Sequence, residues 1–347
     1  MKEIILTIDY ELFFGNKTGT VNECMIEPTE KLALILEKND SKMTVFWDVL
    51  HYYRLIQLEN KFDQLRKDRT LIENQILSLV EKGHDIQMHL HPHWLDTQFI
   101  DGNWDFNYKK FRLHDLSKEN NIENINTIIG CVTISKNLME NIIRKINPLY
   151  TVRSFRAGGY LIEPFKEIKE ALELNKIIID SSVLTGMYNS NGLFSYNFIN
   201  YPNQCNYRFE DNLAVINETG KFIEFPIATL KISVFMNLIF TIIRRIKYPN
   251  LESKRAGTGL ANVNKINKKS NLQKIIDLLT KKRVYQFTTD NNFRERFDYF
   301  FRKVPNYSVM ILHPKLLNDH TLKLLDEYLS NYKIKFISLY EYLKIYG

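Results

Sequence analysis

Residues 3–11 read Glu-Ile-Ile-Leu-Thr-Ile-Asp-Tyr-Glu, an apolar, β-branched run that ends in two carboxylates. A short apolar run of this kind predicts a buried β-strand. Because side chains two positions apart share one face of a strand, Asp9 and Glu11 should point to the same side while Tyr10 points away. Active sites of (β/α) barrels are built at the carboxyl ends of the strands, so both acids are candidate functional residues.

Outward from this strand, strand and helix patterns alternate, which is typical of an α/β domain with a mostly parallel sheet. Further strands are expected at 43–47, 85–91, 152–155, 176–179, 222–230, 309–312 and 335–337. Helices are expected at 28–38, 71–82, 136–146, 163–174, 232–246, 273–281 and 319–328. This pattern predicts a distorted (β/α) barrel of about seven parallel strands with long loop insertions. A doubly wound open sheet is the alternative, but no Gly-x-Gly-x-x-Gly follows the first strand, which disfavours a dinucleotide-binding fold.

The 347 residues are expected to form one catalytic domain, 1–347, with insertions at about 96–126 and 185–270. A content of 44% apolar residues is enough for a substantial core and is unlike that of a disordered chain. The three cysteines match no Cys-x-x-Cys spacing, so we expect a reducing compartment and no disulfide framework. Charged residues interrupt the apolar run at the beginning of the chain, which we interpret as a strand and not as a signal peptide.

A histidine cluster follows the third expected strand, within residues 83–94, Gly-His-Asp-Ile-Gln-Met-His-Leu-His-Pro-His-Trp. Three of the eight histidines of the chain, His89, His91 and His93, fall within five positions. If the strand continues, alternation places all three on one face; if the chain turns at Pro92, His89 and His93 converge alone. Neutral imidazole is a favoured ligand of zinc and similar ions. The cluster and the two carboxylates together predict a metal site, and a solvated histidine-rich loop is the alternative.

Two further strand ends carry polar residues. In Phe-Arg-Ala-Gly-Gly-Tyr at 155–160, Arg156 can hold a carboxylate in a bidentate pair, and the glycines allow backbone N–H groups to face a ligand. The apolar strand 309–312 ends in His313, a candidate acid or base. Taken alone, each pattern also fits an ordinary turn or a packed histidine. Taken together, the strand-end groups predict a hydrolytic metal site, in which two histidines and one carboxylate leave coordination positions open for water and a substrate carbonyl.

These residues, in this order, resemble the motifs of the polysaccharide deacetylase family, which includes chitin and peptidoglycan deacetylases. The resemblance spans most of the chain and implies a distorted (β/α) barrel. The Asp-x-Glu pair is similar to the first motif, in which Asp9 would be the general base and Glu11 the metal ligand. The Gly-His-Asp-Ile strand and the residues after it are similar to the second motif, His-x-x-x-His. This similarity makes His89 and His93 the histidine ligands and leaves His91 as an additional residue on the substrate side.

The later motifs imply the remaining roles. Arg156 would orient the base, the backbone N–H of Gly159 or Tyr160 would hold the oxyanion, Asp180 would support the catalytic histidine, and His313 would be the general acid. The implied cofactor is one divalent metal ion, with zinc expected. The sequence departs from the family pattern, because it lacks the paired Asp-Asp, the proline of the third motif and a tryptophan after Asp180. These departures leave open which of Asp9 and Glu11 is the general base and which is the metal ligand. They also indicate a divergent branch with its own substrate.

The expected function is therefore that of a metal-dependent hydrolase that removes an N-acetyl or similar acyl group from a sugar, in surface polysaccharide or glycolipid assembly. Two alternatives remain open. One is a catalytically silent, carbohydrate-binding relative, and the other is a metal-dependent hydrolase of a non-sugar amide. A substrate screen would separate the second alternative from a sugar deacetylase.

The charge pattern bears on partners and location. The net charge of +7 favours anionic partners, but no nucleic-acid-binding motif accompanies the basic residues. The apolar stretch 232–246 is too short to span a bilayer, and Arg244, Arg245 and Lys247 lie at its end. One interpretation of this stretch is a core helix that covers the barrel. The alternative is an interfacial helix, 232–247, that brings a cytoplasmic enzyme to the inner face of the membrane and to a lipid-linked sugar.

Overall fold

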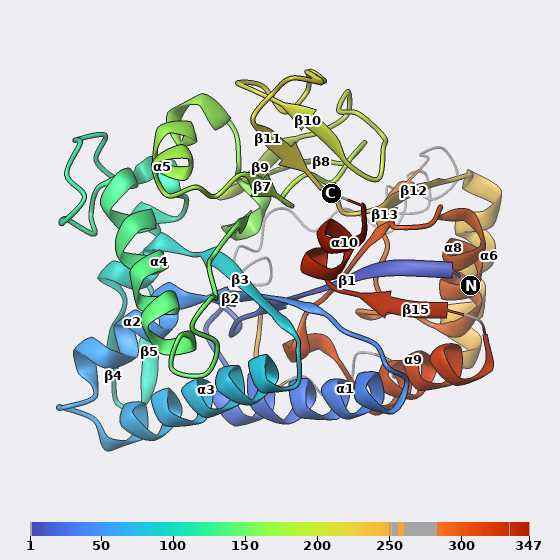
Figure 1. The fold of residues 1–347 in the computed structure, drawn as a ribbon. Helices are drawn as coiled ribbons and strands as arrows, with labels where there is room; N and C mark the ends of the chain where they lie inside the picture. Colours follow the sequence, from blue (N-terminus) through green and yellow to red (C-terminus); the bar gives the residue numbers. More distant parts are fainter. Residues whose placement is uncertain (1, 250, 252–255, 260–282, 333, 347) are drawn as a thin grey trace.

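The structure is a computed structural model that describes the chain except for residues 1, 250, 252–255, 260–282, 333 and 347. Its centre is a nine-stranded sheet in the order β10-β11-β7-β6-β3-β2-β1-β14, with β15 also paired to β1 (Figure 1). The strands are β1 (Lys2–Tyr10), β2 (Thr44–Asp48), β3 (Asp85–Leu90), β6 (Ser154–Ala157), β7 (Ile179–Asp180), β10 (Tyr207–Phe209), β11 (Phe222–Glu224), β14 (Val309–Leu312) and β15 (Ile334–Ile337). All of these pairings are parallel except that between β10 and β11.

The sheet curls, and its two sides are joined at Ile227. This residue forms parallel bridges both to Leu184, which follows β7, and to Val309 on β14. The Ile227 N–H donates to Val183 O at 2.9 Å, and the Ala228 N–H donates to Val309 O at 2.9 Å. Because single bridges complete the ring where a regular barrel has a full strand pair, the expected distorted (β/α) barrel is confirmed.

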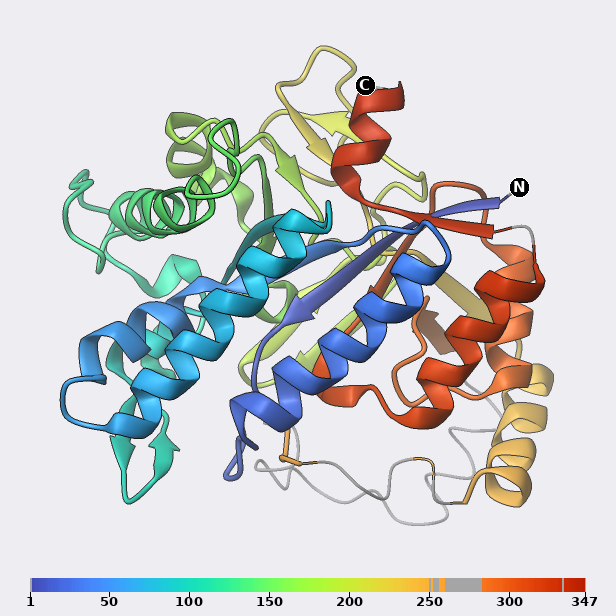
Figure 2. The ribbon, with the colours of Figure 1, turned by 60° about the horizontal axis from the view of Figure 1, so that its bottom comes forward.

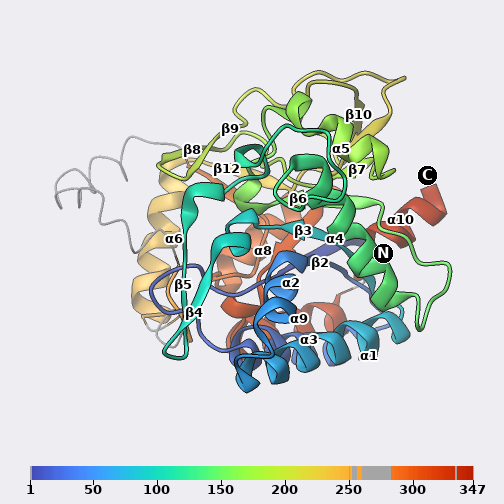
Figure 3. The ribbon, with the colours of Figure 1, turned by 90° about the vertical axis from the view of Figure 1, so that its left-hand side faces the viewer.

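Helices surround the sheet. They are α1 (Glu27–Lys38), α2 (Val49–Leu58), α3 (Asp63–Glu81), α4 (Ile128–Ile143), α5 (Lys169–Leu174), α6 (Val234–Lys247), α8 (Arg294–Lys303), α9 (Asp319–Asn331) and α10 (Leu339–Tyr346). Helices α1, α3 and α9 lie across one side of the curled sheet (Figure 2), whereas α4 and α6 lie on opposite sides of the molecule (Figures 1 and 3).

Several elements differ from the sequence-based expectation. Helix α4 begins at Ile128 and not near 136, because Thr127 caps it by accepting a hydrogen bond from the Gly130 N–H at 3.0 Å. Helix α2, which is rich in aromatic residues, was not expected. The helix expected at 273–281 lies outside the described residues, as does part of the expected insertion at 185–270.

Both expected insertions contain short hairpins where the structure describes them. The hairpins are β4 (Gln98–Ile100) with β5 (Asn103–Asp105), and β8 (Tyr188–Asn191) with β9 (Phe194–Asn197). A third pair joins β12 (Thr229–Ile232) to β13 (Arg283–Gln286).

The central strands are buried on both faces, as in other parallel sheets covered by helices. On β1, Ile4, Ile5, Leu6 and Ile8 are each 0% exposed. Polar side chains nevertheless interrupt this core on β1, β3 and β6: Thr7, Asp9, Gln87, His89 and Arg156 are all buried. Buried polar groups are stable only when they are hydrogen-bonded or paired with an opposite charge. These residues therefore indicate that a functional site lies inside the barrel, near the strand ends.

Helix α6 has one buried and one exposed face. Asn237 and Phe240 are buried, whereas Phe235 is 70%, Ile242 48% and Ile246 75% exposed. The exposed apolar side chains do not fit the interpretation of this segment as an ordinary core helix. No helix in the described part of the chain has the length and apolar character needed to cross a membrane.

Candidate functional site

The two carboxylates at the end of β1 face the interior of the barrel. Asp9 lies in the strand and Glu11 directly follows it, with exposed fractions of 2% and 5%. Tyr10 points the other way, and its hydroxyl donates to Gln75 Oε1 at 2.8 Å. The strand alternation expected from the sequence therefore holds at this position.

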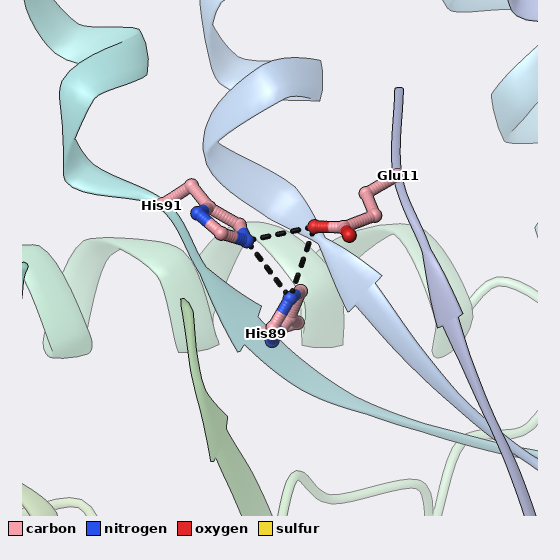
Figure 4. Close-up of side chains that lie close together, drawn as sticks. All are labelled: Glu11, His89 and His91. Carbon is pink, nitrogen blue, oxygen red and sulfur yellow. Dashed lines mark hydrogen bonds and ion pairs between the residues drawn. The ribbon is translucent and has the colours of Figure 1, made fainter. Parts of the chain in front are cut away.

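Glu11 meets two histidines from the end of β3 (Figure 4). Its Oε2 lies 2.7 Å from His91 Nε2 and 3.3 Å from His89 Nε2, and the two histidine nitrogens are 3.0 Å apart. The three side chains are buried, and one ligand atom from each lies within 4.8 Å of the others. This cluster could hold a metal ion.

The orientation of the cluster fits an ion. His89 Nδ1 donates to the Arg156 carbonyl oxygen at 2.8 Å, so in the neutral ring the lone pair is on Nε2, which faces Glu11. A side chain at Gly158 would come within 2.7 Å of His91 Nδ1 and 2.5 Å of Leu90 O, so only glycine leaves room for the His91 ring. Two imidazole nitrogens and one carboxylate form a three-ligand set that leaves coordination positions open.

His93 does not join this cluster. The chain enters a 3₁₀ turn at Pro92, as expected, but the turn carries His93 into an aromatic cluster. Its ring stacks on Trp94 and Phe111 at centroid distances of 5.7 and 5.6 Å, and neither of its nitrogens has a hydrogen-bond partner among the described residues. Burial lowers the pKa of His93 well below its usual range, which keeps the ring neutral. The structure therefore places His91, and not His93, beside Glu11.

Asp9 forms a buried ion pair with Arg156. Arg156 Nη1 lies 2.6 Å from Asp9 Oδ1, and the same guanidinium donates to Thr7 Oγ1 at 3.0 Å and to Ser181 O at 2.7 Å. It also lies over the Phe46 ring, 4.1 Å from the centroid. Burial raises the pKa of Asp9, but the charges of Arg156, His89 and His313 together outweigh it and the net shift is downward. Asp9 is therefore ionised, and its second oxygen is left for other contacts.

His313 follows β14 and lies opposite the two acids. Its Nε2 is 3.6 Å from Asp9 Oδ2 and 3.9 Å from Glu11 Oε1. Its Nδ1 is 2.7 Å from Asp290 Oδ2, which fixes the ring orientation. Burial lowers the pKa of His313, but the hydrogen bond and charge of Asp290 reverse this shift and raise it.

Asp290, and not Asp180, is the acid that forms a hydrogen bond with His313 Nδ1. Asp180 accepts hydrogen bonds from the Ser182 N–H at 3.0 Å and from Ser182 Oγ at 2.8 Å. The Ser182 hydroxyl in turn accepts a hydrogen bond from the Ala157 N–H at 2.9 Å. Asp180 thus supports the end of β6, next to Arg156, and is not among the acids that contact His313 in the described part of the chain.

A pocket of about 340 Å³ opens onto these groups. Asp9, Glu11, His89, His91 and His313 line it, together with Gly159, Tyr160 and the aromatic side chains of Phe13, Phe14, Phe194 and Tyr196. Gly159 and Tyr160 have positive φ angles of 62° and 64°. Such a conformation is uncommon for a tyrosine and is often found at functional sites.

Three residues near the site were missed in the sequence. Lys315 Nζ donates to Glu11 Oε1 at 2.8 Å, and Asp48, at the end of β2, is paired in register with His89. Burial raises the pKa of Asp48 to about 6, and its Oδ2 accepts a hydrogen bond from Trp94 Nε1 at 2.7 Å. Because Asp48 follows an expected strand, its position at a strand end could have marked it as a candidate site residue. No such signal marked Asp290, because the strand before it, β13, was not expected.

No protein-family model and no curated protein sequence matches the chain. Among solved structures, it is similar to a candidate polysaccharide deacetylase from Mycobacterium smegmatis, with 11% identity, 99% of this chain and 89% of that chain covered, and a TM-score of 0.45. It is also similar to Puue allantoinase, with 10% identity, 99% of this chain and 89% of that chain covered, and a TM-score of 0.43. A third similar structure is a 4-alpha-glucanotransferase from Thermococcus litoralis, with 13% identity, 100% of this chain and 40% of that chain covered, and a TM-score of 0.46. Identities and TM-scores this low carry no conclusion about the activity of this chain.

The geometry predicts different effects for two neighbouring histidines. We expect the purified protein to bind one divalent ion, His91→Gln to lose it, and His93→Gln to retain it, because only His91 faces Glu11. Elemental analysis after dialysis against zinc measures the stoichiometry. Full metal content in His91→Gln, with loss in His93→Gln, would restore the ligand set expected from the sequence. Circular dichroism serves as the control for folding.

Proposed function

We propose that the chain is a metal-dependent hydrolase that removes an N-acetyl or similar acyl group from a sugar. One observation supports this proposal above the others: a cluster of three residues that could hold a metal ion, an ionised carboxylate and an oriented histidine converge on one pocket. A hydrolase of this class needs an activated water, a proton acceptor and a proton donor within reach of one carbonyl group.

Glu11, His89 and His91 would hold the ion. When bound, a divalent ion such as zinc lowers the pKa of water and polarises a carbonyl oxygen. Asp9 is held ionised by Arg156, with Oδ2 toward His313, and is placed to accept a proton from water. His313, oriented by Asp290, is placed to hold a proton at Nε2 and to donate it to the leaving amine. Lys315 stabilises the negative charge of Glu11.

The pocket walls favour a carbohydrate over a small amide. Phe194 and Tyr196, on the β8–β9 hairpin, present apolar ring surface that suits the C–H face of a sugar ring. A second pocket of about 750 Å³ shares Tyr160 and Tyr196 with the first. The space available therefore continues past the site of the chemistry, which supports a substrate larger than one sugar residue.

Acetate release tests this proposal. We expect acetate from at least one member of a panel of N-acetylated sugars, and a loss of about 10²–10⁴-fold in turnover in His313→Gln, with metal content unchanged. His320→Gln, a histidine on α9 outside the pocket lining, is the matched control and should keep its turnover.

Two results would contradict the proposal. If zinc-loaded protein releases no acyl group from any sugar or amide, the silent, carbohydrate-binding alternative is favoured. If it cleaves only non-sugar amides, the non-sugar hydrolase is favoured. Normal turnover in His313→Gln would remove His313 from the acid role.

We also propose that the enzyme works in the cytoplasm, at the inner face of the membrane, on a lipid-linked sugar. The support is the exposed apolar face of α6, with Phe235, Ile242 and Ile246, and the basic residues in its last turn. Lys247 forms an ion pair of 2.7 Å with Glu295, so part of its charge is already balanced.

Sedimentation with vesicles tests this location. We expect binding to vesicles that contain an anionic phospholipid, weaker binding at high salt because ions screen the attraction, and further loss in Phe235→Ser/Ile246→Ser. Leu149→Ser, which removes a side chain 89% exposed elsewhere, is the control. Binding that is absent, or that is equal in both variants, would end the membrane proposal.

A further inference from the structure

Two buried carboxyl groups lie side by side at the ends of β7 and β11. Asp180 and Glu224 are paired in register on these neighbouring parallel strands, so their side chains lie on the same side of the sheet. They are 1% and 0% exposed. Burial raises the pKa of Glu224 well above its usual range, and the negative charge of Asp180 raises it further. Two adjacent carboxylates in such a place are not both ionised, so the pair is expected to hold one proton.

The hydrogen bonds around the pair indicate which carboxyl group carries this proton. Asp180 Oδ1 accepts a hydrogen bond from Ser182 Oγ at 2.8 Å, and Asp180 Oδ2 accepts one from the Ser182 N–H at 3.0 Å, which favours ionised Asp180. Glu224 Oε1 accepts a hydrogen bond from the Val183 N–H at 3.0 Å, but no donor among the described residues reaches Glu224 Oε2. A proton on Glu224 Oε2 removes this deficit, because its O–H can donate to the Asp180 side chain within hydrogen-bonding range.

The other ionisable groups around Glu224 do not reverse this assignment. The positive charge of Arg156 favours ionised Glu224, but the Arg156 guanidinium is already paired with Asp9 at 2.6 Å. Tyr207, which is paired in register with Glu224 on β10, and Tyr201 both interact with the Glu224 charge. Burial raises the pKa of both phenols, so they are neutral and do not balance a negative charge.

The same two strand ends hold Arg156 in place. Ser181, which follows β7, accepts a hydrogen bond from Arg156 Nε at its carbonyl oxygen (2.7 Å) and one from Arg156 Nη2 at its hydroxyl (2.9 Å). The Ser181 hydroxyl donates to the carbonyl oxygen of Phe225, which follows β11, at 2.8 Å. A hydrogen bond between Asp180 and Glu224 therefore ties together the two strand ends on which the Arg156 guanidinium rests.

We propose that Glu224 is held as a neutral acid whose O–H donates to ionised Asp180, and that it is a positioning residue for Arg156. Ionisation of Glu224 would put a second negative charge beside Asp180 and would compete with Asp9 for the charge of Arg156. It would also replace the hydrogen bond between β7 and β11 by repulsion. The bound proton does not depend on the proposed deacetylation, whereas its effect on turnover rests on that proposal.

Infrared spectroscopy at neutral pH detects the proton directly, because a protonated carboxyl group has a C=O stretching band at higher frequency than an ionised one. We expect such a band in the wild-type protein, and we expect Glu224→Gln to lack it. Glu81→Gln, which changes an exposed glutamate of α3, is the matched control and should keep the band. A wild-type spectrum without the band, or an unchanged band in Glu224→Gln, would overturn the proposal.

Thermal unfolding as a function of pH is the second measurement. The pKa of Glu224 is raised on folding, so its contribution to stability is complete below the unfolded-state value and is lost as the pH rises through the folded-state value. Above the usual glutamate value of about 4.3, the melting temperature of the wild-type protein should therefore fall relative to that of Glu224→Gln. Equal pH dependence of the two proteins would contradict a proton held on Glu224.

A pair of variants tests the positioning role. The Gln amide can donate to Asp180 and accept from Val183, whereas Leu can do neither, so Glu224→Gln should be more stable than Glu224→Leu. We expect Glu224→Gln to retain acetate release and Glu224→Leu to lose most of it, with metal content unchanged in both. Equal stability and equal turnover in the two variants would remove the positioning role. Absence of acetate release from all of the proteins, with the infrared band present, would contradict the proposed deacetylation and not the bound proton.

Discussion

The site depends on the buried ion pair between Arg156 and Asp9. The Arg156 guanidinium holds Asp9 at 2.6 Å, and the carbonyl oxygen of the same residue accepts the Nδ1 hydrogen of His89 at 2.8 Å. One residue on β6 therefore sets both the ionisation of the proposed base and the tautomer of a proposed metal ligand. Removing one partner of such a pair leaves an uncompensated charge in the core, which is strongly destabilising. Asp180, through Ser182 and Ala157, fixes the strand end on which this arrangement stands.

Much of the fold could be predicted from the sequence, because parallel strands buried on both faces are marked by continuous apolar runs. For example, the apolar run at the beginning of the chain correctly predicts β1, and strand alternation correctly predicts that Asp9 and Glu11 face the same side. What could not be predicted depends on long-range contacts. The ring closes through single bridges at Ile227, and no local pattern encodes a pairing of that residue with both Leu184 and Val309.

The sequence indicates which strand ends carry the candidate site residues, but it does not decide which contacts each of these residues makes. The histidine cluster pointed to the end of β3, but the choice between His91 and His93 depended on where the strand ended and how the 3₁₀ turn rotated the next ring. The motif resemblance favoured His93, whereas alternation along the strand also allowed His91. The partner of His313 could not be found locally, because Asp290 is brought to it by tertiary packing across 23 positions of the chain.

We propose that Glu11, His89 and His91 bind one metal ion. Anomalous X-ray diffraction at the zinc edge, from crystals grown with zinc, tests it most directly. We expect a single strong peak about 2.0–2.2 Å from Glu11 Oε2, His89 Nε2 and His91 Nε2. A peak coordinated by His93, or no peak near Glu11 at all, would contradict it.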